Sequence, residues 1–297
     1  MLTGIEVAVI GGDARHLEVI RRLADMDAGV TLFGYDNWQN GFGGVKRGKL
    51  QPEALATMDA LILPIAGMDD SGAIESIFSS EPLVLEEAHF SRLKPEARVY
   101  TGFAKSRLKE LCGRYGIHLE ELLERDDVAI YNSIPSAEGA LMLAIQHTDI
   151  TIHSSQCMVL GFGRTGMTLA RVLQGLGAKV KVGVRRSEHY ARAVEMGFQP
   201  FYTKQLSREI GDVDMLFNTV PELIVTAKVI SEMKHSAIII DLASKPGGTD
   251  FRYAEKRGIH AILAPGLPGI VAPKTAGKIL AMCLEQLLGE QITDRGN

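Results

Sequence analysis

The sequence predicts an α/β protein of two domains, each built on a mostly parallel β-sheet. A chain of 297 residues is long enough for about two domains of ordinary size. Short apolar runs typical of buried strands alternate with amphipathic helical segments, which is the pattern of βαβ units. Two strands run directly into glycine-rich turns, at residues 11–12 and 161–166. Together these observations predict two Rossmann-like domains, with a cofactor in the cleft between them.

Composition limits the class of protein further. Hydrophobic residues make up 46% of the chain, with no low-complexity tract, as in an ordered globular protein. The net charge of −4 gives no general attraction to nucleic acid. The three cysteines are far apart in the sequence, so we expect no metal site and a reduced, cytoplasmic environment. No charged apolar leader and no apolar run of about 18 residues is evident, which argues against secretion and membrane spanning.

The first domain is predicted to span residues 1–134. Asp13 is expected to cap the helix that follows the first strand. The turn GGDAR at 11–15 lacks the third glycine of a dinucleotide motif, so it is either an ordinary βα connection or one that directs Asp13 and Arg15 into a ligand-binding cleft. Residues 36–44 are expected to form a surface loop. The strand-like runs are 7–10, 30–33, 60–65, 82–85 and 98–101, with 117–124 closing the domain.

The second domain is predicted to span residues 135–274. Residues 131–135 (YNSIP) interrupt the pattern before it, and 136–147 are expected to form a connecting helix. A final helix at 275–290, which Thr275 can cap, is expected to pack back on the first domain. The six predicted strands of the second domain are 157–160, 179–184, 198–202, 215–218, 237–241 and 260–264, a series typical of the doubly wound dinucleotide fold.

The most informative motif is the strand–turn–helix at residues 158–170, MVLGFGRTGMTLA. Within it Gly161 permits a tight turn, Gly163 lets the backbone approach a pyrophosphate, and Gly166 lets helix and strand pack closely. The first-turn amides and the positive end of the helix dipole would face the anion, so Arg164 and Thr165 are also predicted to contact the cofactor. The alternative is a structural turn that binds nothing.

Residues at the end of this domain's second strand indicate which dinucleotide is bound. An acid there would bind the ribose hydroxyls and select NAD, but the sequence offers Arg185, Arg186 and Ser187, with no acid until Glu188. Two guanidinium groups and a hydroxyl suit a 2′-phosphate, because Arg forms charge-assisted forked bonds with phosphate. The sequence therefore predicts NADP, with a solvated basic turn as the alternative.

Two further segments are predicted to border the nicotinamide. After the fourth strand, Asn218 and Thr219 either bind the cofactor or cap the following turn, and Val220 and Pro221 are expected beside them. Ser244 and Lys245, after the fifth strand, are equally open to a structural or a functional role. The segment 264–275 is too rich in Gly and Pro for a helix or strand, so we expect an apolar loop that walls the pocket with Gly266 and Pro268.

Six segments, spread over essentially the whole chain, are distinctive: 8–15 (AVIGGDAR), 124–135 (ERDDVAIYNSIP), 144–148 (AIQHT), 160–168 (LGFGRTGMT), 241–251 (DLASKPGGTDF) and 264–277 (APGLPGIVAPKTAG). They resemble the family of dipicolinate synthase A subunits from spore-forming bacilli. The resemblance implies a dehydrogenase that uses NADP to oxidise a dihydrodipicolinate to dipicolinate (pyridine-2,6-dicarboxylate) for sporulation, in the cytoplasm of the mother cell. It also implies that the partner is a separate, flavoprotein-like B subunit; a homo-oligomer is equally compatible with it.

A small dicarboxylate substrate would need cationic and hydrogen-bonding partners. Arg15 and Lys274 are predicted to recognise its carboxylates, and Asn132 and Ser133 to add neutral hydrogen bonds. Loss of a hydride to the cofactor leaves a ring proton to be removed, for which Lys274 or a bound water is the expected base.

Three alternatives remain at this stage. A D-2-hydroxyacid dehydrogenase would need a late His–carboxylate pair, and the chain has no His between Ala261 and its C-terminus. A methylenetetrahydrofolate dehydrogenase would share the Pro-Gly-x-x-x-Pro-x-Thr pattern at 268–275, but its Tyr-x-x-x-Lys is missing because Pro135 stands four residues after Tyr131. A non-catalytic NADP-binding subunit would keep Arg185 and Arg186 without turnover.

Overall fold

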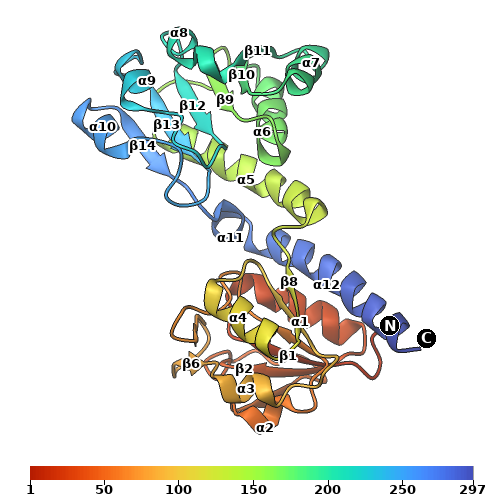
Figure 1. The fold of residues 1–297 in the computed structure, drawn as a ribbon. Coiled ribbons are helices and arrows are strands. Elements are labelled where there is room, and N and C mark those ends of the chain that lie inside the picture. Colours follow the sequence, from red (N-terminus) through yellow and green to blue (C-terminus); the bar gives the residue numbers. More distant parts are fainter. Residues whose placement is uncertain (297) are drawn as a thin grey trace. The chain divides into compact units, whose positions relative to one another are not determined.

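Two compact units make up the part of the chain that the computed structural model describes, residues 1–296. Unit 1 comprises residues 1–128 together with the C-terminal segment from Pro273, and unit 2 comprises residues 129–272. Each unit is built on its own six-stranded sheet (Figure 1). The predicted fold class, an α/β protein with two Rossmann-like domains and parallel sheets, is confirmed.

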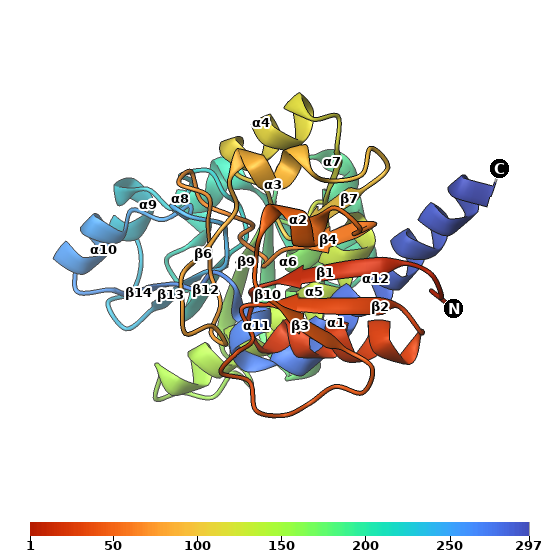
Figure 2. The same ribbon diagram turned by 90° about the horizontal axis from the view of Figure 1, so that it is seen from below.

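The sheet of unit 1 is entirely parallel and has the order β3-β2-β1-β4-β7-β8. The first three of these strands lie side by side in Figure 2. The order reverses between β1 and β4, which is the switch point at which doubly wound sheets bind ligands. The strands are β1 (Glu6–Ile10), β2 (Gly29–Phe33), β3 (Lys46–Gly48), β4 (Ala60–Ile62), β7 (Arg98–Thr101) and β8 (His118–Glu121).

Two differences from the sequence-based expectation concern this unit. The three exposed residues of the edge strand β3 carry no apolar signal, and it was not predicted. The predicted strand at 82–85 does not join the main sheet. Its residues Leu83–Val84 form β6, which pairs antiparallel with β5 (Ala73–Ile74) in a separate two-stranded sheet. Pairing with the two residues of β5 satisfies backbone hydrogen-bonding groups of β6. This apolar segment therefore does not need to pair with a strand of the parallel sheet.

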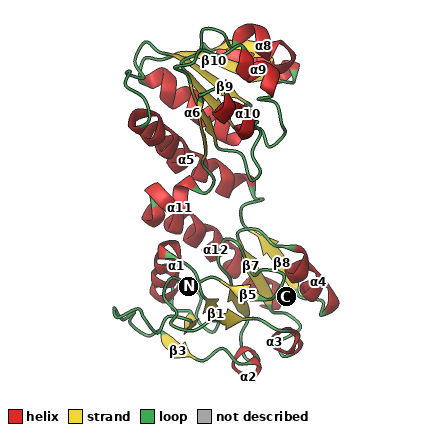
Figure 3. Ribbon diagram, turned by 90° about the vertical axis from the view of Figure 1, so that its left-hand side faces the viewer, coloured by secondary structure: helices red, strands yellow, loops and turns green. Residues whose placement is uncertain are grey.

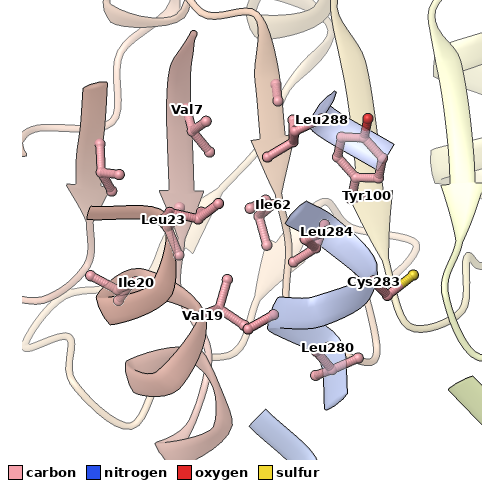
Figure 4. Packing of buried hydrophobic residues seen from close by; sticks show 14 of the residues in the cluster. Val7, Val19, Ile20, Leu23, Ile62, Tyr100, Leu280, Cys283, Leu284 and Leu288 are labelled. Carbon is pink, nitrogen blue, oxygen red and sulfur yellow. The ribbon is translucent and has the colours of Figure 1, made fainter. Parts of the chain in front are cut away.

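The C-terminal helix α12 (Pro273–Gly296) packs on helix α1 (Ala14–Asp25) and on the sheet of unit 1. Figure 4 shows three leucines of α12 beside Val19 and Leu23 of α1 and Ile62 of β4; they are Leu280, Leu284 and Leu288. Burial of these side chains is the main stabilising contribution of α12 to unit 1. The other helices of the unit are α2 (Pro52–Leu55), α3 (Glu87–Ser91) and α4 (Ser106–Arg114), and the α12 leucines are Leu280, Leu284, Leu287 and Leu288.

The sheet of unit 2 has the same topology, with the order β11-β10-β9-β12-β13-β14 and every pair parallel. All six strands were predicted, with boundaries that differ by one residue at most. They are β9 (Gln156–Leu160), β10 (Lys179–Val184), β11 (Gln199–Tyr202), β12 (Met215–Asn218), β13 (Ile238–Asp241) and β14 (His260–Leu263). The helices are α6 (Arg164–Gly175), α7 (Ser187–Glu195), α8 (Leu206–Glu209), α9 (Ala227–Ser231), α10 (Phe251–Lys256) and α11 (Leu267–Val271), with the 3₁₀ turn η1 (Thr203–Gln205).

The predicted break at residues 131–135 is wrong, because α5 (Asp126–Gln146) is one continuous helix with Pro135 inside it. The ring removes one hydrogen-bond donor, but Ala137, Ala140 and Ala144 are fully buried in the same apolar cluster as residues of α6 and β9, and this packing holds the helix together. The course of α5 can be followed in Figure 3. By length and hydropathy α5 could also cross a membrane, although 39% of its most apolar window is buried, and core helices pass the same test.

The sequence predicts a loop at 264–275, and this prediction is wrong. Gly266 adopts a left-handed conformation (φ 71°) and caps the short helix α11, and Pro273 begins α12. Proline is tolerated in the first turn of a helix, because the N–H that it lacks would have no intrahelical partner there. Pro268 and Pro273 lie in the first turns of α11 and α12 and are therefore compatible with both helices. Thr275 consequently lies inside α12 and is not its cap.

Candidate functional site

Two of the three motif glycines are required by the packing of unit 2 itself. Gly161 follows β9 with φ 91°, and a Cβ atom there would lie 2.4 Å from Thr219 Oγ1. A Cβ atom on Gly166 would lie 2.1 Å from the Gly161 carbonyl oxygen, so this glycine lets α6 approach the strand end. Both glycines would be needed in the absence of any ligand.

Gly163 differs, because the fold leaves it room for a side chain. Its φ of −94° suits any residue, and a Cβ atom there would meet no described atom within 4 Å. It is the N-cap of α6, where it offers no side chain to accept hydrogen bonds from the first-turn amides. The helix N-terminus therefore faces open space with donors and a positive dipole, which fits a pyrophosphate group.

This open space belongs to a pocket of about 620 Å³ at the carboxyl ends of β9, β10 and β12. The ends meet where the strand order reverses, the usual ligand position in this fold (Figure 1). Nine of the predicted cofactor residues line it together: Gly161, Gly163, Arg164, Thr165, Arg185, Arg186, Thr219, Val220 and Pro221.

The remaining predicted cofactor residues lie outside the lining. Gly166 is buried beneath the glycine turn, and Ser187 begins α7 directly after the two arginines. Gly266 caps α11 and Pro268 lies in its first turn, and Leu267 of this helix packs closely on Gly139 of α5. Contact between these four residues and a cofactor stays a prediction.

Both arginines of the pocket are partly neutralised by carboxylates. Arg185 Nη1 lies 3.6 Å from Oε1 of Glu222, and Arg186 Nε lies 2.8 Å from Oε1 of Glu188. Arg186 also donates to His189 Nε2 over 3.3 Å. All four charged side chains are more than half exposed, so these ion pairs are weak and a ligand phosphate can replace them.

Seven lining residues were not among the predicted site residues: Phe162, Gly183, Val184, His189, Thr203, Glu222 and Ile224. His189 stands one helical turn after Arg186, and its ring meets Phe162 edge-on at 6.4 Å. Glu222 directly follows the predicted Pro221. For His189 and Glu222, the available signal in the sequence was their closeness to predicted residues. The sequence gives no such signal for Thr203, because it reaches the pocket from the end of a different strand.

A buried carboxylate organises the loops beneath the pocket. Asp241 and Asn218 are fully buried and paired in register on β13 and β12. Asp241 accepts hydrogen bonds from Asn218 Nδ2 (3.0 Å), the Gly248 amide (2.8 Å) and Thr249 Oγ1 (2.6 Å). The side-chain amide of Asn218 is therefore engaged within the protein. This fits the alternative in which Asn218 caps the following turn and does not bind the cofactor. Thr219 Oγ1 likewise donates to the Leu160 carbonyl, although it also lines the pocket.

In unit 1, Arg15 is held against the N-cap of α1. Asp13 caps the helix as predicted, accepting from the Arg15 amide, and its carboxylate also takes hydrogen bonds from Arg15 Nε (3.0 Å) and Nη2 (2.5 Å). Burial alone would raise the pKa of Asp13, but hydrogen bonds from His16 and Arg15, together with the Arg15 charge, lower that pKa far below its usual value. The Asp13 carboxyl is thus ionised at neutral pH.

Arg15 and Lys274 line different pockets of unit 1. Arg15 borders a pocket of about 510 Å³ at the switch point after β1 and β4, together with Asp13 and Glu75. Lys274 is exposed, forms no ion pair with any described residue, and borders a pocket of about 390 Å³ beside the aromatic rings of Trp38 and Phe42.

Asn132 and Ser133 are neighbours on α5 but differ in availability. Ser133 is buried, donates to the Ile130 carbonyl over 2.6 Å and lies 2.6 Å from Thr168 Oγ1 on α6. Its hydroxyl is therefore engaged in helix packing. Asn132 Oδ1 is buried and has no hydrogen-bond partner among the described residues, so it can still accept a bond from a ligand.

Two family models match the chain. A model described as the N-terminal domain of the dipicolinate synthase A subunit matches residues 6–123, and one for the alanine dehydrogenase/PNT C-terminal domain matches residues 134–296. A dehydrogenase-type Rossmann domain of this kind implies a nicotinamide cofactor and an oxidoreductase. At the level of fold alone, the chain also resembles a transhydrogenase from Sinorhizobium meliloti, with 14% identity, a TM-score of 0.67 and coverage of 95% and 94% of the two chains.

Much closer likeness extends over the full length. The dipicolinate synthase A subunit of Bacillus subtilis is 49% identical over 296 residues, which is 100% of both chains, and its crystal structure has a TM-score of 0.96 with coverage of 99% of each chain. The crystal structure of the dipicolinate synthase A subunit from Bacillus halodurans is 52% identical, with a TM-score of 0.94 and coverage of 97% and 99%. The designation of these proteins as A subunits implies a second, partner subunit. With this identity over its whole length, the chain belongs to the family of dipicolinate synthase A subunits.

Proposed function

We propose that this protein is the dehydrogenase subunit of a dipicolinate synthase and uses NADP to oxidise a dihydrodipicolinate to dipicolinate. The observation that carries the proposal is the single pocket that joins the open cradle at Gly163 to Arg185 and Arg186. It lies in a chain that matches the named subunit of Bacillus subtilis from end to end.

Within this pocket the residues would hold distinct parts of the cofactor. The first-turn amides of α6, including that of Thr165, and the side chain of Arg164 would bind the pyrophosphate. Arg185 and Arg186, with Ser187 at the start of α7, would bind the 2′-phosphate. Thr219, Val220 and Pro221 would border the dinucleotide, and Gly266 and Pro268 the nicotinamide, which accepts a hydride when bound.

The substrate would be held by groups outside the cofactor pocket. Arg15 and Lys274 would bind its two carboxylates, and Asn132 Oδ1 would accept a hydrogen bond. Ser133 would contribute only by giving up its present bonds. Oxidation removes a hydride and a ring proton together, and Lys274, exposed and without an ion pair to any side chain that the structure describes, would take the proton directly or through water.

The proposal includes a partner and a setting. A flavoprotein-like B subunit would complete the synthase, and the protein would act in the cytoplasm of a sporulating mother cell. Both statements rest on the full-length likeness to the Bacillus subtilis protein.

The test is a turnover experiment with the full chain. Dihydrodipicolinate generated enzymatically is mixed with NADP and the protein, with and without the B subunit, and NADPH is followed by absorbance while dipicolinate is identified by chromatography. We expect equal amounts of both products. Normal NADP binding without NADPH in either mixture would refute the dehydrogenase and show a non-catalytic NADP-binding subunit.

A further inference from the structure

We propose that Glu222 is a specificity-determining residue of the cofactor pocket, where it competes with an adenosine 2′-phosphate for Arg185. This inference rests on the proposed NADP site and adds to it an acidic group that opposes the phosphate. Glu222 lines the same pocket as Arg185, with the carboxylate oxygen Oε1 3.6 Å from Nη1 of the guanidinium.

The backbone that carries Glu222 is held in place although the side chain is exposed. Gly248 lies directly beneath it, where a Cβ atom would be 2.4 Å from the Val220 carbonyl oxygen and 2.5 Å from that of Glu222. The Gly248 carbonyl accepts hydrogen bonds from the amides of Ile224 (3.1 Å) and Val225 (2.9 Å). The Glu222 carboxylate can therefore rotate about its side-chain bonds, but its Cα stays at the pocket rim.

The same loop is fixed on its other side by the glycine turn. Thr219 Oγ1 donates to the Leu160 carbonyl over 2.8 Å, and the side chains of Thr219 and Val220 fill the space above Gly161. The distance between Glu222 and the pyrophosphate cradle is thus set by the fold. A dinucleotide seated on the cradle meets Glu222 and Arg185 together.

Charge decides what Glu222 does to each cofactor. A ribose with a free 2′-hydroxyl can donate to the carboxylate and accept from the guanidinium, so the Arg185–Glu222 pair can remain. A 2′-phosphate bears close to two negative charges, must separate Arg185 from Glu222, and is repelled by the carboxylate. At about 6 Å in largely aqueous surroundings, with salt screening, this repulsion corresponds to roughly three- to tenfold in affinity.

The test substitutes Glu222→Gln, which keeps the size and hydrogen-bonding capacity of the side chain and removes its charge. Dissociation constants for NADPH and NADH are measured by fluorescence titration of the full chain. We expect NADPH to bind about three- to tenfold more tightly and NADH to change by less than about twofold. The matched control is Glu188→Gln, which removes the carboxylate 2.8 Å from Arg186 that is not part of the pocket lining, and it should give a clearly smaller gain.

A second variant asks whether Glu222 acts through Arg185. In an Arg185→Ala background, the part of the gain from Glu222→Gln that comes from competition for Arg185 should disappear, and only the part that comes from direct repulsion of the phosphate should remain. Full retention of the gain, an unchanged NADPH affinity in Glu222→Gln, or an equal gain in Glu188→Gln would each overturn the inference. If the unsubstituted protein binds neither NADPH nor NADH, the proposed function fails instead, so the two failures are distinguishable.

Discussion

Substitution of the two glycines at the start of α6 separates what the fold requires from what the cofactor requires. A Cβ atom on Gly163 meets no described atom within 4 Å, whereas one on Gly166 would lie 2.1 Å from a backbone carbonyl oxygen. Gly163→Ala should therefore leave the protein folded and impair cofactor binding. Gly166→Ala should destabilise unit 2 whether or not cofactor is present.

The magnitudes follow from these surroundings. Alanine is a poorer N-cap than glycine but restricts the unfolded chain, and the two effects nearly cancel, so Gly163→Ala should change the unfolding free energy by less than about 1 kcal/mol. The added methyl would displace the pyrophosphate from the first-turn amides of α6. Loss of one charge-assisted hydrogen bond costs about 1.5–3 kcal/mol, which is roughly a ten- to hundredfold weaker complex. For Gly166→Ala, the backbone shift should cost about 1–3 kcal/mol of stability.

Calorimetry without cofactor gives the unfolding midpoints, and fluorescence titration gives NADPH affinity. An NADPH affinity in Gly163→Ala equal to that of the wild type would contradict the proposal that the N-terminus of α6 binds the pyrophosphate. A midpoint for Gly166→Ala equal to that of Gly163→Ala would contradict the packing argument.

Three further variants test charged residues. Replacing Arg185 and Arg186 together by Ala should weaken NADP about tenfold or more and leave NAD nearly unchanged in titrations, since only NADP carries the 2′-phosphate; equal losses would refute that role. Lys274→Ala should lower turnover about a hundredfold with an unchanged unfolding midpoint; an unchanged rate would exclude Lys274 as the base. Asp13→Asn keeps a helix cap but loses a carboxylate of lowered pKa, so its stability deficit in urea unfolding should be full at neutral pH and shrink below about pH 3.9; a pH-independent deficit would contradict this.

Local patterns predicted the sheets well and the helix boundaries less well. Every strand of unit 2 carries an apolar run bounded by turn residues, and the order of the strands follows from the doubly wound pattern. The continuity of α5 was not predictable in this way, because Pro135 gives a strong local stop signal. What maintains the helix is burial of Ala140 and Ala144 against elements that come later in the chain.

The pocket of unit 2 was predictable only where one contiguous segment lines it. The glycine turn and the Arg185–Arg186 pair each lie on a single strand–helix connection, so spacing alone predicted them as neighbours in one site. The role of Asn218 stayed open because its partner Asp241 is 23 residues away, and only the register of β12 and β13 places them together. Glu222 was not predicted for the same reason, since its ion-pair partner Arg185 lies on a different strand–helix connection.

The residue at the N-cap explains why two sheets of identical topology differ in their suitability for a dinucleotide. In unit 1 the N-cap is Asp13, whose carboxylate satisfies a first-turn amide of α1 and places a negative charge where an anion would sit. A Cβ atom on Gly12 would also lie 2.5 Å from the His16 ring, so the space above that turn is filled. In unit 2 the N-cap is Gly163, which supplies neither charge nor bulk. The helix dipole and amides of α6 are consequently available to a pyrophosphate, whereas those of α1 are already committed to Asp13.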